Sequence, residues 1–108
     1  MSPSHFSENE LLKTVLGPLL EDFQYWFSRS QSLLEAQEIS LLTKEEQADL
    51  LTRLSHAQQE VKVAQMLLQA TDGQAGIETA TLVPWHRLVA ECWQLSQKWR
   101  SHQAQAYD

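Results

Sequence analysis

Residues 43–73 of this 108-residue chain read TKEEQADLLTRLSHAQQEVKVAQMLLQATDG and contain the signals of a complete helix. Thr43 and Glu46 have the spacing of a capping box, in which each side chain binds a backbone amide at the helix start. Gly73 is a residue that commonly ends a helix. The positions that recur on steps of three and four are Gln47, Leu50, Leu54, Ala57, Val61, Ala64 and Leu68. The pattern predicts a helix over residues 44–71 with one buried face.

A second helical pattern lies upstream, over residues 8–37. Ser7 and Glu10 also have capping-box spacing. The inward positions recur at Leu12, Leu16, Leu19, Phe23, Trp26, Ser30 and Leu33. Gly17-Pro18 falls inside this stripe, where a proline removes one backbone hydrogen bond and crowds the preceding turn. The stripe stays in phase across the pair, which favours one continuous helix kinked at 17–18 over two helices separated by a break.

A third helical pattern begins at Pro84, a residue well suited to the first position of a helix. Its apolar stripe consists of Trp85, Leu88, Cys92, Leu95 and Trp99. The pattern predicts a helix over residues 84–102 and a frayed polar tail over 103–108. Residues 72–83 are predicted to form a loose connection that contains two of the three glycines.

Three helices with coiled-coil-like stripes predict an all-α fold, an antiparallel three-helix bundle in one domain over residues 1–108. The first two helices would form a long hairpin, closed by a shorter third helix. That inequality would leave part of the hairpin's apolar face uncovered, so we expect a second copy or a partner helix to complete the bundle. The chain is therefore expected to be a homo-oligomer or to bind a partner protein.

The charge and composition argue against several classes of partner. The net charge of −6 and the isoelectric point of about 5.1 predict repulsion from nucleic-acid phosphates and anionic lipid headgroups. The chain has one cysteine and therefore no internal disulfide, which suits a reducing compartment. No apolar run approaches the roughly 20 residues of a transmembrane helix. No signal peptide is evident, so we expect a cytoplasmic protein.

No catalytic, cofactor or metal site is predicted. A di-iron bundle needs Glu-x-x-His pairs, and no histidine here has an acidic residue three positions before it. His56 and Glu60 lie one turn apart, but two ligands do not make a site, and we interpret them as a solvated pair. Cys92 lies on the apolar stripe, where a thiol is usually buried and unreactive. We therefore expect a protein that is not an enzyme.

The candidate interaction residues are aromatic and arginine side chains on the first and third helices. Tyr25 points away from the apolar stripe, as either an interface residue or a half-buried one. Three of the four tryptophans lie on the third helix, and Trp93 sits about 100° from the face that holds Trp85. Tryptophan and arginine are enriched at binding hot spots. The candidates are Tyr25, Trp85, Arg87, Trp93 and Arg100, with packing of Trp93 onto the first helix as the structural alternative.

Five short motifs together form a distinctive pattern along the chain: ELLK at 10–13, PLLEDF at 18–23, EEQADLL at 45–51, PWH at 84–86 and ECW at 91–93. This pattern resembles a family of small, uncharacterised cyanobacterial proteins. The resemblance spans nearly the whole chain and implies a cytoplasmic protein of a photosynthetic bacterium, with no reaction and no catalytic residues. The leading hypothesis is a non-enzymatic interaction module, a small helical adaptor, regulator or assembly factor. The alternatives are a carrier of a small ligand or pigment between the helices, and a cryptic metal or redox protein.

Overall fold

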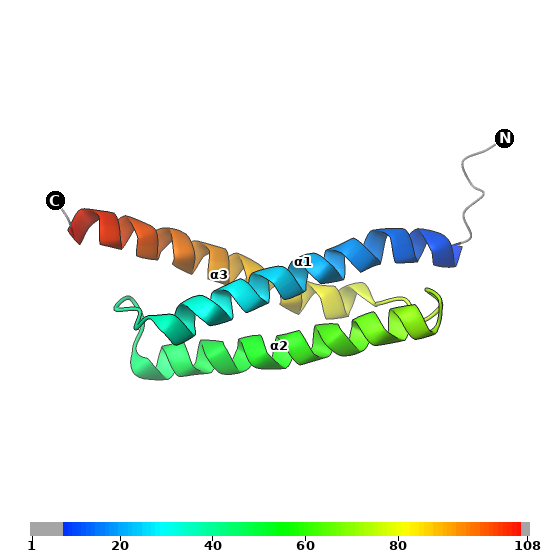
Figure 1. The fold of residues 1–108 in the computed structure, drawn as a ribbon, viewed down its shortest axis with the longest axis horizontal. Coiled ribbons are helices and arrows are strands. Elements are labelled where there is room, and N and C mark those ends of the chain that lie inside the picture. The colour runs from blue at the N-terminus through cyan, green and yellow to red at the C-terminus, as the bar shows by residue number, and fades with distance from the viewer. Residues whose placement is uncertain (1–7, 107–108) are drawn as a thin grey trace.

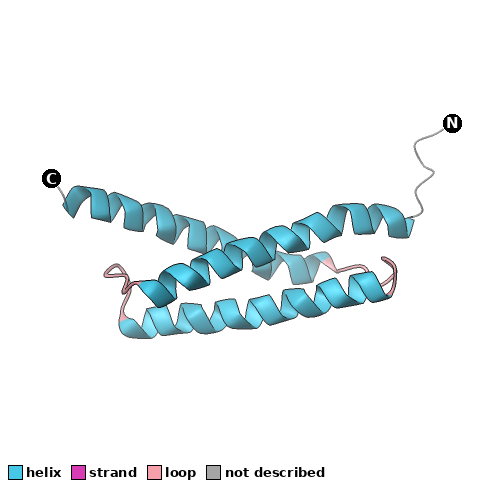
Figure 2. Cartoon of the chain, in the orientation of Figure 1, coloured by secondary structure: helices cyan, strands magenta, loops and turns pink. Residues whose placement is uncertain are grey.

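The computed structural model describes the backbone of residues 8–106 and the side chains of residues 11 and 14–105. The elements are α1 (Glu8–Ala36), α2 (Lys44–Ala70) and α3 (Thr79–Ala106), and the described residues include no strand. Helices α1 and α2 form an antiparallel hairpin, and α3 runs in the direction of α1 and crosses it obliquely (Figure 1). Two short loops join the helices (Figure 2). The predicted all-α three-helix bundle is confirmed.

Helix α2 begins with the predicted capping box. The Glu46 N–H donates to the Thr43 hydroxyl at 3.0 Å, and the Thr43 N–H donates to the Glu46 carboxylate at 2.8 Å. The buried side chains of α2 follow the predicted stripe and are Leu50, Leu54, Ala57, Val61 and Leu68. The helix ends at Ala70, and Gly73 adopts a φ of 88°, which is costly for any residue with a Cβ.

Helix α1 is continuous through Pro18, so the alternative of two helices separated by a break is wrong. The residue before a proline is normally pushed out of helical geometry, because its Cβ meets the proline ring. Gly17 has no Cβ, which removes part of that clash and lets the helix continue. The buried side chains of α1 are Leu16, Leu20, Phe23, Phe27 and Leu34. Four members of the predicted stripe are only half-buried, and these are Leu19, Trp26, Ser30 and Leu33. The predicted capping box at Ser7 and Glu10 lies outside the side chains that the structure describes.

The carboxyl end of α1 is held by a side chain from α2. The Gln47 amide nitrogen donates to the carbonyl oxygens of Leu34 and Gln37, at 2.8 and 2.9 Å. The Gln47 amide oxygen accepts from the Ile39 N–H at 3.0 Å. Ile39 is fully buried beneath the connection. Gln47 thus satisfies carbonyls that the last turn of a helix leaves without a partner.

Helix α3 is longer than predicted, because it begins at Thr79 instead of Pro84 and continues to Ala106. With 28 residues it nearly matches the 29 of α1 and the 27 of α2, so the prediction of a shorter third helix is wrong. The early start has a packing reason, since Ile77 and Leu82 lie partly buried against the core. The prediction of a frayed tail from residue 103 is likewise wrong as far as Ala106.

An ion pair joins α3 to α2. The two terminal guanidinium nitrogens of Arg53 donate to the two carboxylate oxygens of Glu91, at 2.8 and 2.9 Å. Its third nitrogen, Nε, donates to Asp49 at 2.9 Å. The hydrogen bonds from Arg53 hold the pKa of Glu91 below its usual value, and burial partly opposes this shift. All of these groups remain substantially exposed.

Candidate functional site

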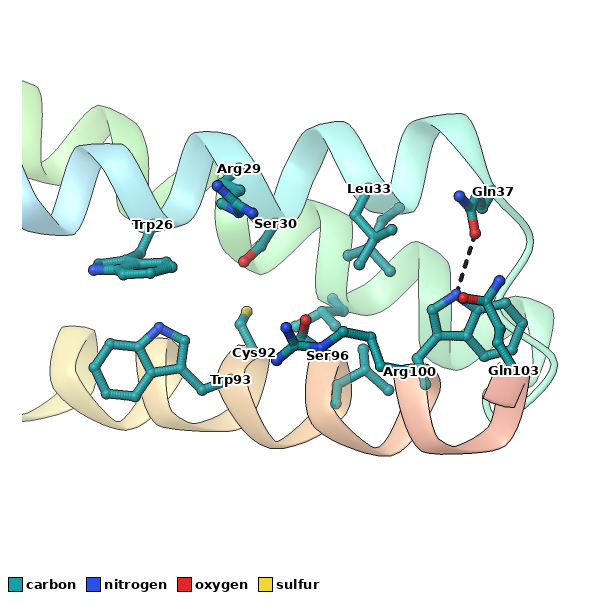
Figure 3. Close-up of a pocket in the computed structure, with 14 residues that line it drawn as sticks. Trp26, Arg29, Ser30, Leu33, Gln37, Cys92, Trp93, Ser96, Arg100 and Gln103 are labelled. Carbon is teal, nitrogen blue, oxygen red and sulfur yellow. Dashed lines mark hydrogen bonds between the residues drawn. The ribbon is translucent and has the colours of Figure 1, made fainter. Parts of the chain in front are cut away.

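A groove runs between the carboxyl-terminal half of α1 and the corresponding part of α3 (Figure 3). Its floor is formed by apolar side chains of the core, and it contains a cavity of about 220 Å³. The buried or half-buried floor residues are Leu33, Leu34, Leu50, Cys92 and Leu95. A second, more open hollow of about 390 Å³ adjoins the cavity and shares five of its residues, which are Trp26, Arg29, Trp93, Ser96 and Arg100. We call the two hollows together the α1–α3 groove.

Two tryptophans close one end of the α1–α3 groove. Trp26 from α1 and Trp93 from α3 meet edge to face, with ring centroids 5.3 Å apart and planes at 85°. Tyr25 packs on the other side of Trp26, at 5.0 Å and 83°. Trp93 keeps 44% of its surface exposed although it packs on α1. The packing alternative for Trp93 is therefore correct, and the ring still presents a large aromatic surface to solvent.

The other end of the groove is fixed by hydrogen bonds between distant parts of the chain. The Trp99 indole N–H donates to the Gln37 side chain at 3.1 Å, the contact dashed in Figure 3. One turn further along, the Ser40 hydroxyl and the His102 ring nitrogen Nε2 lie 3.3 Å apart. The rings of Trp99 and His102 stack with centroids 5.6 Å apart. These contacts join α3 to the connection that follows α1.

Two arginines flank the groove from opposite helices, Arg29 on α1 and Arg100 on α3 (Figure 3). Both are exposed. Arg29 donates to the Tyr25 hydroxyl at 3.1 Å. Neither arginine forms an ion pair with any side chain that the structure describes. The residues that line the groove include no aspartate or glutamate, so the groove is locally cationic on a chain with a net charge of −6.

Cys92 lies on the floor of the groove with its sulfur directed toward Ser30 (Figure 3). Burial raises the pKa of its thiol above the ordinary value, and a hydrogen bond with Ser30 partly opposes that rise. A thiol with a raised pKa is a poor nucleophile at neutral pH. The geometry supports the interpretation of Cys92 as a packing residue.

The structure brings together three of the five predicted interaction residues. Tyr25, Trp93 and Arg100 all lie in or beside the α1–α3 groove. Arg87 lies elsewhere, in a separate hollow between α2 and α3 that also contains His56 and Glu60.

Trp85 is only 3% exposed and packs edge to face on Phe23, with centroids 5.9 Å apart. It is therefore a core residue and no candidate for direct contact with a partner.

Trp26 and Arg29 were not among the five predicted interaction residues. Trp26 was assigned to the buried stripe, yet it is only half-buried and forms one wall of the groove. The available signal was the step of four between Tyr25 and Arg29, which places both on one side of α1. The contact of Trp26 with Trp93 could not be inferred from the sequence. The two residues are 67 positions apart, and their meeting depends on the relative register of α1 and α3.

The described residues also bear on a metal site and on a membrane-spanning helix. Among the side chains that the structure describes, no three or more histidine, cysteine or acidic groups gather closely enough to hold a metal ion. The helices of the same region also lack a segment of the length and hydropathy that would cross a membrane.

The fold and the groove define a small all-α protein whose first and third helices enclose an aromatic groove flanked by arginines. The chain belongs to the family described as protein of unknown function (DUF2605), whose model matches residues 6–101. The predicted membership of an uncharacterised family is thereby confirmed. Comparison with curated proteins gave no match, and comparison with solved structures gave none either.

Proposed function

We propose that this protein is a non-enzymatic interaction module, a small helical adaptor, regulator or assembly factor, and that it binds a partner protein in the α1–α3 groove. The observation that carries the proposal is the placement of Trp93. Its ring is 44% exposed, rests on Trp26, and lies beside an apolar cavity between two arginines. Binding hot spots combine these features: a tryptophan, arginines and a pocket that a partner's side chain can fill.

The size of the cavity favours a protein partner over a bound pigment. Pockets that hold small molecules commonly measure about 300–1,000 Å³ and bury most of the ligand, whereas the cavity here measures about 220 Å³ and the hollow of about 390 Å³ beside it is more open to solvent. Such a volume suits one or two side chains of a partner. The apolar floor keeps a small-ligand carrier as the second candidate function, because an aliphatic ligand could use the same surface.

Self-association is a further part of the proposal, and it rests on a different surface. The outer face of α2 carries three exposed apolar side chains one turn apart, Val63, Met66 and Leu67, and Met66 is 61% exposed. A second copy could cover this stripe. The expectation of an oligomer that rested on a shorter third helix does not hold, because α3 is not shorter.

We also propose that the protein lies in the cytoplasm, and the resemblance to cyanobacterial proteins supports a photosynthetic bacterium as its source.

Affinity capture from the native cell, run in parallel with matched variants, tests the proposed function. The protein captured by the wild type should be lost with Trp93→Ala and with Arg100→Gln, which changes an exposed side chain and leaves the core intact. It should be retained by Gln59→Ala and Arg87→Gln, which change exposed side chains outside the groove. Circular dichroism of every variant verifies folding. A partner retained equally by all four variants would show that the groove is not the binding site.

A further inference from the structure

We propose, on the basis of the proposed function, that the occupant of the α1–α3 groove is an acidic peptide segment of the partner. One large apolar side chain of this segment would enter the cavity, and carboxylates on either side of that residue would pair with Arg29 and Arg100. The proposal names the chemistry of the partner and the part played by each wall of the groove.

The charges around the groove indicate an acidic ligand. The chain has 14 acidic residues against eight lysines and arginines, yet the lining of the groove contains two arginines and no acid. Arginine presents a planar fork of donors that matches a carboxylate in two parallel hydrogen bonds. An arginine on each helix, one on either side of the cavity, fits a ligand with more than one carboxylate (Figure 3).

The floor of the groove indicates that the ligand also has a large apolar side chain. Leu34, Leu50 and Cys92 are each at least nine-tenths buried and form an apolar base. The walls are aromatic, Trp26 and Trp93 at one end and Trp99 at the other. A leucine or aromatic side chain entering this space would leave water for an apolar surface, which favours binding in proportion to the area covered. The ligand is therefore an apolar anchor set among acidic residues.

The arrangement favours a peptide segment over the other occupants. A fatty acid has a single carboxylate and would leave one of the two arginines without a partner. The separate apolar stripe of Val63, Met66 and Leu67 on α2 is the surface proposed for a second copy of this chain, which leaves the groove for a different partner. A short segment places acidic groups at the two arginines alone.

A library of 12-residue peptides displayed on phage, selected on the wild-type protein, tests the proposal. The enriched sequences should contain a leucine or aromatic residue with Asp or Glu on both sides. Synthetic versions should lose affinity roughly two- to fivefold on Arg29→Gln or Arg100→Gln, the loss expected for one exposed ion pair. Arg87→Gln, an exposed arginine outside the groove, serves as the matched control and should leave affinity unchanged. Affinity should also fall as salt increases.

Each contrary result overturns the proposal in a distinguishable way. Enriched peptides that require Trp93 but carry no acidic residues would refute the acidic ligand and leave the groove as the interaction site. Dodecanoate binding that is tighter than the peptides and is lost with Trp93→Ala would identify a lipid ligand instead. A dimer in sedimentation that Trp93→Ala dissociates would identify a second copy. Enrichment of no peptide would refute a linear ligand, while the capture experiment decides the proposed function independently.

Discussion

Replacing Trp85 and Trp93 separately by alanine should show that two tryptophans eight positions apart on one helix have different roles. Trp85 is 3% exposed and packs on Phe23. Truncating a buried tryptophan costs about 3–5 kcal/mol of unfolding free energy, from lost burial and from the cavity left behind. Against a total of about 5–15 kcal/mol for a domain, Trp85→Ala should remove a large fraction of the stability.

Trp93→Ala should lower the free energy of unfolding by about half as much as Trp85→Ala. Slightly more than half of its surface is covered, since 44% remains exposed. Scaling the cost of full burial by that share gives about 2 kcal/mol. Urea unfolding followed by circular dichroism at constant pH measures both values. If Trp93→Ala destabilised the protein as much as Trp85→Ala, Trp93 would be a structural residue and the assignment of the groove would lose its main support.

Three further predictions concern the fold and its titratable groups. Gln47→Ala should lower the free energy of unfolding by about 2–3 kcal/mol, because it removes three hydrogen bonds of about 1 kcal/mol each at the end of α1. The exposed Gln59→Ala is the control in the same urea titration. Equal effects of the two substitutions would contradict the capping role of Gln47. Cys92 should react with an aromatic disulfide reagent at pH 8 roughly tenfold or more slowly in the native protein than in urea. The reason is that burial raises the pKa of its thiol. Equal reaction rates in the two conditions would contradict the burial of Cys92. The lowered pKa of Glu91 stabilises the fold above the unfolded-state pKa, and this contribution is lost as pH falls through the folded-state pKa. The difference in unfolding free energy between the wild type and Glu91→Gln should therefore shrink on acidification. At neutral pH it should be at most about 1 kcal/mol, because both partners of the ion pair are about half exposed. A difference independent of pH would refute the ion pair.

The helices could be predicted from local chemistry, and their exact ends only where a local signal exists. Thr43 and Glu46 fixed the start of α2, because both partners of a capping box lie within one turn. The start of α3 was misplaced at Pro84, which favours the first position of a helix but here lies inside α3 as its sixth residue. Packing of Ile77 and Leu82 extends the helix before it, and that burial is a tertiary property.

The groove was predictable only in part. The exposure of Tyr25 and of Trp93 followed from their angles around single helices. The meeting of Trp26 with Trp93, and of Arg29 with Arg100 across one cavity, depends on how α3 crosses α1. Gln47 is a similar case, because its position on the stripe of α2 gave no sign that it would cap a different helix. Contacts between helices distant in sequence require the register between them, which no local pattern specifies.

The four tryptophans provide the most direct test of the groove as a binding site, because each indole N–H gives its own signal in a nitrogen-15 NMR spectrum. The protein would be titrated with the tightest synthetic peptide from the selection on the wild type. Binding in the α1–α3 groove predicts that the indole signals of Trp26 and Trp93 shift with the same affinity, while that of the buried Trp85 stays in place. A titration that shifts Trp85 alone, or leaves Trp26 and Trp93 unchanged at saturation, would contradict the assignment of the groove.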